Sequence, residues 1–100
     1  VAEQGGKVVG QILITYEFSD WRDGVFWWIQ SVYVYPDFRG RGVYRALHEH
    51  VAAAARAADD VCGLRLYVDR RNTRAQEVYR RLGLHEAGYE MYEVDWRLAR

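Results

Sequence analysis

The stretch that decides the fold covers residues 32–47 and reads Val32-Tyr-Val-Tyr-Pro36-Asp-Phe-Arg39-Gly-Arg-Gly42-Val-Tyr-Arg-Ala-Leu47. It begins as an apolar strand, which Pro36 stops because proline has no N–H for the strand ladder. A basic turn with two glycines follows, and helical spacing of apolar residues begins after Gly42. The first amides of a helix have no partner within it, so this order of strand, turn and helix predicts an anion site.

The composition of the turn indicates which anion it binds. Glycines let a phosphate approach the backbone closely, and Arg39, Arg41 and Arg45 add positive charge around the same place. The turn therefore predicts a pyrophosphate site. It is not a dinucleotide fingerprint, which needs a third glycine where Arg45 stands, nor a P-loop, since the chain's one lysine is Lys7. The simpler alternative is an ordinary turn with arginines for solubility.

Strand and helix patterns extend on both sides of this stretch. Two runs of β-branched and aromatic residues flank Asp23-Gly24, a pair that favours a tight hairpin turn. Thr73 and Gln76 fit a capping box, Asn72 is a second candidate cap, and Gly83 suits a helix end. The predicted elements are a strand stub at residues 1–3, strands at 8–16 and 25–35, a helix over 42–58, a strand at 64–69, a helix over 75–82 and a strand over 84–97.

Length and composition exclude several classes of protein. One hundred residues allow one domain, and 50% hydrophobic residues exclude a disordered chain. No apolar run approaches the ~20 residues of a membrane span, and the first residues lack the features of a signal peptide. We therefore expect a cytoplasmic protein with no membrane partner. The net charge is zero, but residues 39–81 carry ten arginines against five carboxylates, which predicts one local anion site rather than nucleic-acid binding.

The sequence predicts no metal site. His48 and His50 are two residues apart on the predicted helix and face different sides of it, so we interpret both as helix-surface residues. Cys62 is the one cysteine, and it can form neither an internal disulfide nor a thiolate metal site.

Two segments together resemble the GCN5-related N-acetyltransferase (GNAT) family. Residues 39–44 match its Arg/Gln-x-x-Gly-x-Gly/Ala signature except at Tyr44, and residues 66–84 match its Asn-x-x-Ala-x-x-x-Tyr-x-x-x-Gly-Phe/Leu block from Asn72 onward. The resemblance covers about residues 7–96. It implies an α/β fold with a mixed, mostly antiparallel twisted sheet and helices on both faces. It also implies that residues 1–100 are a single acetyltransferase domain that lacks the usual N-terminal strand and first two helices.

The resemblance assigns roles in binding acetyl-CoA, a co-substrate, without a metal. Backbone amides of the basic turn would hold the pyrophosphate, and the preceding strand would pair with the pantetheine arm, with Val34 hydrogen-bonding it. Asn72 would contact the pantetheine or cap its helix. Tyr44 replaces a small residue and would either crowd the pyrophosphate or point away. The implied coenzyme-binding residues are Val32, Tyr33, Val34, Phe38, Arg39, Gly40, Arg41, Gly42, Val43, Tyr44, Arg45 and Asn72.

The implied reaction is direct attack by a primary amine, a small molecule rather than a protein, on the acetyl carbonyl. Tyr79 would protonate the leaving thiolate, or it is simply a core aromatic residue. Some relatives that acetylate polyamines carry a glutamate where this chain has Gln30, which cannot act as a base. The remaining candidates for the base are Glu17, Asp20, or a water held by Gln30 and Ser31. Trp27 or Trp28 would form a wall of the acceptor pocket.

Three further expectations concern partners. Strand edges left bare by the short N-terminus predict a homodimer through a shared sheet or strand exchange. The alternative to an enzyme is a weakly catalytic acyl-CoA-binding module that needs a partner chain. RNA binding through the Arg-Gly-Arg-Gly turn is not expected, because the chain lacks repeated units and an aromatic stacking platform.

Overall fold

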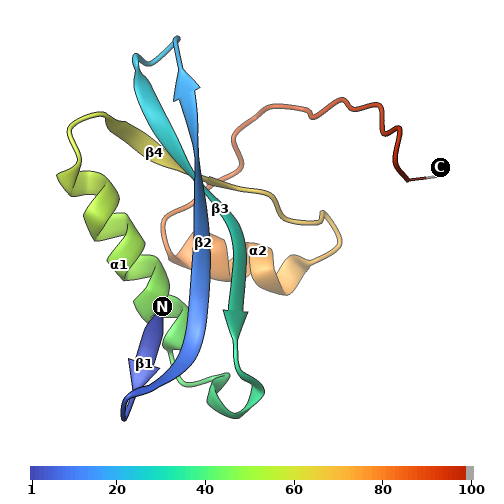
Figure 1. Ribbon diagram of the computed structural model, residues 1–100. Coiled ribbons are helices and arrows are strands. Elements are labelled where there is room, and N and C mark those ends of the chain that lie inside the picture. Colours follow the sequence, from blue (N-terminus) through green and yellow to red (C-terminus); the bar gives the residue numbers. More distant parts are fainter. Residues whose placement is uncertain (99–100) are drawn as a thin grey trace. The chain divides into compact units, whose positions relative to one another are not determined.

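The computed structural model describes residues 1–98, and the chain forms two compact units, Val1–Tyr67 and a second that begins at Val68. Figure 1 shows the elements along the chain. The first unit contains β1 (Ala2–Gln4), β2 (Lys7–Ser19), β3 (Gly24–Val34), the 3₁₀ turn η1 (Pro36–Phe38), α1 (Val43–Ala57) and β4 (Val61–Leu66). The second unit contains α2 (Thr73–Arg81).

The strands form one sheet in the order β1-β2-β3-β4. β1 pairs antiparallel with β2, β2 antiparallel with β3, and β3 parallel with β4. The hairpin between β2 and β3 turns at Asp23, whose φ of 49° is left-handed, directly before Gly24. These pairings confirm the predicted mixed, mostly antiparallel sheet and the hairpin at Asp23-Gly24.

Helix α1 lies along the sheet and contacts all four strands (Figure 1). Its buried stripe consists of Leu47, His48, Val51, Ala52 and Ala55, the spacing of one helix face. The start of α1 comes close to β2 at Gly10, where a Cβ would lie 2.9 Å from Val43 Cγ1. Glycine at position 10 therefore lets the helix approach the strand.

The burial of His48 corrects the sequence-based interpretation. His48 is only 4% exposed, and its Nδ1 has no hydrogen-bond partner within residues 1–98. His50, by contrast, is exposed as expected. Helical spacing alone misplaced His48, because the buried stripe of α1 is wide enough to include the residue beside Leu47.

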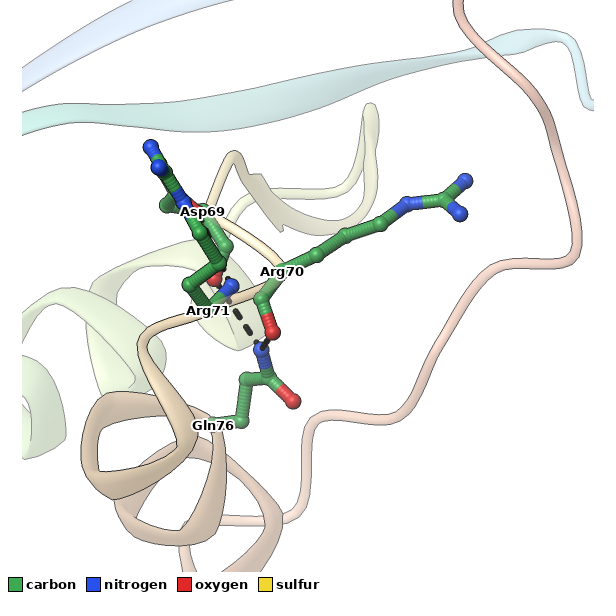
Figure 2. A network of polar contacts seen from close by, with 4 residues as sticks. All are labelled: Asp69, Arg70, Arg71 and Gln76. Carbon is green, nitrogen blue, oxygen red and sulfur yellow. Dashed lines mark hydrogen bonds and ion pairs between the residues drawn. The ribbon is translucent and has the colours of Figure 1, made fainter.

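In the second unit, α2 begins where Asn72 Oδ1 accepts a hydrogen bond from the Ala75 amide at 3.1 Å. Gln76 Nε2 reaches back to the carbonyl oxygens of Asp69 and Arg70, at 3.0 and 2.9 Å (Figure 2). Asp69 in turn accepts two bonds from the Arg71 guanidinium and one from its amide, which lowers the pKa of the carboxyl. Side chains of this segment thus fix the start of the predicted second helix.

The predicted strand over residues 84–97 is wrong. These residues form no helix or strand, and the large side chains from Tyr89 to Trp96 are exposed, Tyr92 by 92% and Trp96 by 87%. The segment has the composition of a strand, but a strand exists only when its backbone pairs with another. The predicted strand at 64–69 is present but shifted, as β4 over Val61–Leu66.

The burial of His48 predicts a pH-dependent stability. Desolvation, helped by Arg56 and opposed by Glu49, lowers the pKa of His48 below 6.5. The unfolded chain therefore takes up the proton first, and the free energy of unfolding falls as the pH drops from 7.5 through 6.5 toward the folded pKa. We expect urea unfolding of His48→Leu to show a flatter pH dependence than wild type over this range. His50→Gln is the matched exposed control, and equal slopes in all three proteins would contradict the prediction.

Candidate functional site

The turn between β3 and α1 is an open backbone cradle. Gly40 and Gly42 have φ of 75° and 80°, left-handed values that favour glycine, and a Cβ at either would meet nothing within 4 Å. The Ala46 amide donates to the Gly42 carbonyl at 3.0 Å and closes the first turn of α1. Amides before such a bond point past the helix end without an intrahelical acceptor. The donor set and the open space fit a phosphate group.

Part of the predicted loop uses its amides internally. The Phe38 amide donates to Tyr35 O at 2.9 Å and the Arg39 amide to Pro36 O at 3.3 Å, which forms the one-turn helix η1. Residues 40–45 are therefore the segment whose backbone can serve an anion. Binding of an anion by residues 38–45 stays a prediction, and within that loop the Phe38 and Arg39 amides already have backbone acceptors.

The three arginines of the turn differ in their contacts. Arg39 Nε donates to Val34 O at 2.9 Å, and its guanidinium lies 5.6 Å from the centre of the Tyr33 ring. Arg45 forms an exposed ion pair with Glu49 at 2.9 Å. Arg41 lies over the Phe38 ring and has no ion pair in the described part of the chain. Arg41 is thus the cation of the turn that remains for an anionic ligand.

Beside this turn, β3 leaves its parallel neighbour. The last register pair joins Ile29 to Leu66, whereas β3 continues to Val34. On its other side β3 stays paired with β2, because Val34 is opposite Gly10. Residues 30–34 therefore present an edge that no strand within residues 1–98 covers. This edge leads directly into the glycine turn.

A β-bulge marks the point of departure. Consecutive residues Leu13 and Ile14 of β2 face Ser31 and Ile29, so Gln30 is an extra residue in β3. Its side chain is held by a hydrogen bond from Nε2 to Thr15 Oγ1, 2.7 Å long. The bulge and this bond place a polar group where the open edge begins.

Tyr44 lies along α1, with its ring centre 6.0 Å from that of the buried His48. Residues four apart share one helix face, so the half-buried Tyr44 and the buried His48 lie on the same face of α1. Val43 of the same turn packs near Gly10, as described above.

The predicted residues of the second unit lie on α2. Asn72 caps the helix, which is one of the two roles expected for it. Tyr79 lies in the second half of α2 and is half-buried. Sequence patterns placed both residues correctly on or beside this helix.

A cluster on the sheet was not anticipated as a unit; we call it the Glu17 cluster. Glu17 Oε1 accepts from Trp28 Nε1 and from Arg65 Nη1, both at 3.0 Å. The Arg65 guanidinium lies 3.6 Å from the centre of the Phe26 ring, and Trp28 stacks on Tyr67 at 4.6 Å. The cluster joins three strands, and only their register, which no local pattern encodes, could have revealed it.

Residues 1–98 contain neither a metal-binding cluster nor a membrane-spanning helix. No group of three or more histidine, cysteine, aspartate or glutamate side chains could hold a metal ion in this part of the chain. Over the same residues, no helix is long and apolar enough to cross a membrane.

Comparison with known proteins identifies the class to which this fold and turn belong. The model of the Acetyltransferase (GNAT) family matches residues 1–84. The chain therefore belongs to the GNAT acetyltransferase family, which confirms the resemblance of its two motifs.

Individual relatives agree with this assignment. The chain is 36% identical over 84 residues to a thialysine N-epsilon-acetyltransferase of Bos taurus, covering 83% of this chain and 48% of that protein. A possible acetyltransferase from Clostridium difficile 630 is 42% identical, with a TM-score of 0.84 over 90% of this chain and 59% of that one. The chain thus spans about half the length of the curated relative that it matches.

A more distant structure shares the fold alone. Arabidopsis thaliana Naa50, solved with the bisubstrate analogue CoA-Ac-MVNAL, is 23% identical, with a TM-score of 0.65 over 78% of this chain and 50% of that one.

The cap at Asn72 gives a prediction for α2. Asn72→Ala removes the acceptor of the Ala75 amide, which should cost about 1 kcal/mol of local stability. Hydrogen exchange of the Ala75 amide should accelerate accordingly. Asn72→Asp keeps an oxygen at the same place and should leave the exchange slow. Equal exchange in wild type and Asn72→Ala would show that the cap contributes nothing.

Proposed function

We propose that this protein is an acetyl-CoA-dependent N-acetyltransferase that acetylates a primary amine of a small molecule. The observation that carries the proposal is the open edge of β3 at residues 30–34, which leads into the glycine turn. An unpaired strand edge suits an extended, amide-containing chain, and the turn suits a pyrophosphate. The relative that acetylates thialysine supports a small-molecule amine as acceptor.

The chain's own groups suggest how the coenzyme would be held. Backbone amides of residues 40–45 and the Arg41 guanidinium would bind the pyrophosphate. Val32, Tyr33 and Val34 would pair with the pantetheine arm along the open edge. The Val34 carbonyl already accepts a hydrogen bond from Arg39 Nε at 2.9 Å. We therefore expect that bond to be shared or broken when the pantetheine arm binds. Acetyl-CoA, when bound, supplies the activated acetyl group.

Proton transfer would use two different groups. The Tyr79 hydroxyl would donate a proton to the departing thiolate. Removing the amine proton needs a group beside the open edge. Glu17 is held by Trp28 and Arg65, and Asp20 lies at the turned end of the hairpin, where its carbonyl accepts from Asp23. We favour a water held by Gln30 and Ser31 as the group that takes the proton from the amine.

The test of this function is CoA release from acetyl-CoA over a panel of primary amines. We expect turnover by wild type and a loss of about 100-fold in kcat for Tyr79→Phe, the scale of one general acid, with unchanged coenzyme affinity by calorimetry. Tyr89→Phe, in the exposed C-terminal segment, is the matched control and should keep wild-type activity. Tight coenzyme binding without turnover of any amine would instead favour an acyl-CoA-binding module that needs a partner chain.

We also propose a homodimer formed through a shared sheet or strand exchange. The outer edge of β4 pairs with no strand within residues 1–98. The C-terminal segment exposes Met91, Val94 and Trp96, apolar side chains that pairing with a second chain would cover. Sedimentation equilibrium should therefore give twice the chain mass of 11.7 kDa. Val94→Lys should shift the mass toward the monomer, and a wild-type protein that is monomeric at all concentrations would refute the dimer.

A further inference from the structure

The Glu17 cluster lies on the face of the sheet turned away from α1. Glu17 is opposite Phe26, and Thr15 is opposite Trp28, in the β2–β3 register. Side chains alternate along β2, so residues 15 and 17 share one face, and Gly10, which contacts α1, belongs to the other. Along this face the cluster leads toward Gln30, where the open edge of β3 begins.

One oxygen of the Glu17 carboxylate accepts no hydrogen bond within residues 1–98. Both hydrogen bonds to its carboxylate, from Trp28 and Arg65, end on Oε1. Oε2 accepts no hydrogen bond from residues 1–98, and the side chain is 48% exposed. Two donors thus fix the orientation of a carboxylate that still offers one oxygen to solvent, which is the arrangement of a preorganised acceptor.

A positively charged side chain, Arg22, lies close to Glu17's neighbour Phe26. The Arg22 guanidinium is 5.1 Å from the centre of the Phe26 ring, the ring that Arg65 also covers. Arg22 is exposed and has no ion pair within the described residues. Near Phe26, one carboxylate oxygen and one guanidinium therefore have no hydrogen bond or ion pair within residues 1–98, and together they complement a group with both charges.

The path from this charge pair to the open edge suits a methylene chain. Trp28 and Tyr67 form an aromatic wall, with ring centres 4.6 Å apart, beside the Glu17 carboxylate. From Trp28 to Gln30 is two strand residues, about 7 Å. An extended chain of four or five methylenes spans such a distance. A ligand with its charged head at Glu17 would therefore bring its far end to the start of the open edge.

We propose that Glu17 and Arg22 recognise the zwitterionic head of an amino acid whose side chain ends in a primary amine. The α-ammonium donates to Glu17 Oε2, the α-carboxylate accepts from the Arg22 guanidinium, and the methylenes lie along Trp28 and Tyr67. The terminal amine then lies beside Gln30, where the acetyl group would be delivered. This inference rests on the proposed function, because it names the acceptor of that same site.

Four amine substrates test the contributions of the α-ammonium and the α-carboxylate separately. Lysine carries both, 1,5-diaminopentane lacks the carboxylate, 6-aminohexanoate lacks the α-ammonium, and pentylamine lacks both. Glu17→Gln should raise KM about 10- to 100-fold for lysine and 1,5-diaminopentane only, as expected for losing a charged hydrogen bond. Arg22→Gln should do the same for lysine and 6-aminohexanoate only. In both variants kcat should change little, and pentylamine should remain the poorest acceptor.

Controls and a second readout keep the failure of this inference distinct from that of the proposed function. Glu3→Gln and Arg74→Gln remove exposed charges elsewhere and should leave every KM at its wild-type value. The Trp28 Nε1–H resonance, assigned by Trp28→Phe, should shift on adding lysine without coenzyme. Glu17→Gln should abolish this shift, although the amide oxygen of that variant can still accept from the indole.

No acetylation of any amine, with the lysine-induced shift present and lost in Glu17→Gln, would refute the proposed function and support the amino-acid site. Equal KM changes for all four acceptors, or no shift of the Trp28 resonance with lysine, would overturn the inference about Glu17 and Arg22.

Discussion

The departure of β3 from β4 is the constraint on which the site depends. Strand backbone needs hydrogen-bond partners, and β3 has β2 on one side over its whole length but β4 on the other only as far as Ile29. The extra residue Gln30 lies at this point, and Arg39 meets the Val34 carbonyl further along. The result is a strand edge that is held straight from one side and left available on the other.

Residues 39–81, the arginine-rich part of the sequence, do not all present their charge to solvent in the same way. Three of the ten arginines in this part pair with a carboxylate close by in the sequence: Arg45 with Glu49, Arg71 with Asp69 and Arg81 with Glu77, at exposed positions where each pair contributes little stability. Arg41 at the glycine turn is the contrasting case, a cation without an ion pair in the described structure. Among the three arginines of the turn, Arg41 is thus the one with neither an ion pair nor a side-chain hydrogen bond within residues 1–98.

Prediction from sequence succeeded where the interaction is local and failed where it is not. The hairpin at Asp23-Gly24 and the cap at Asn72 follow from the preferences of a few neighbouring residues, and both are present. Residues 84–97 have strand composition, but composition cannot supply a pairing partner. The burial of His48 was also not predicted, because tertiary contacts with the strands decide which face of α1 is buried.

The sequence by itself determined the order of the elements as far as α2, the family motifs and the glycines that shape the turn after β3. These features depend on backbone preferences within a few residues. Tertiary structure alone decided the open edge at residues 30–34 and the joining of Glu17, Trp28 and Arg65 from three strands. Strand register and crossover bring those side chains together across up to 48 positions of sequence, and no local preference encodes such contacts.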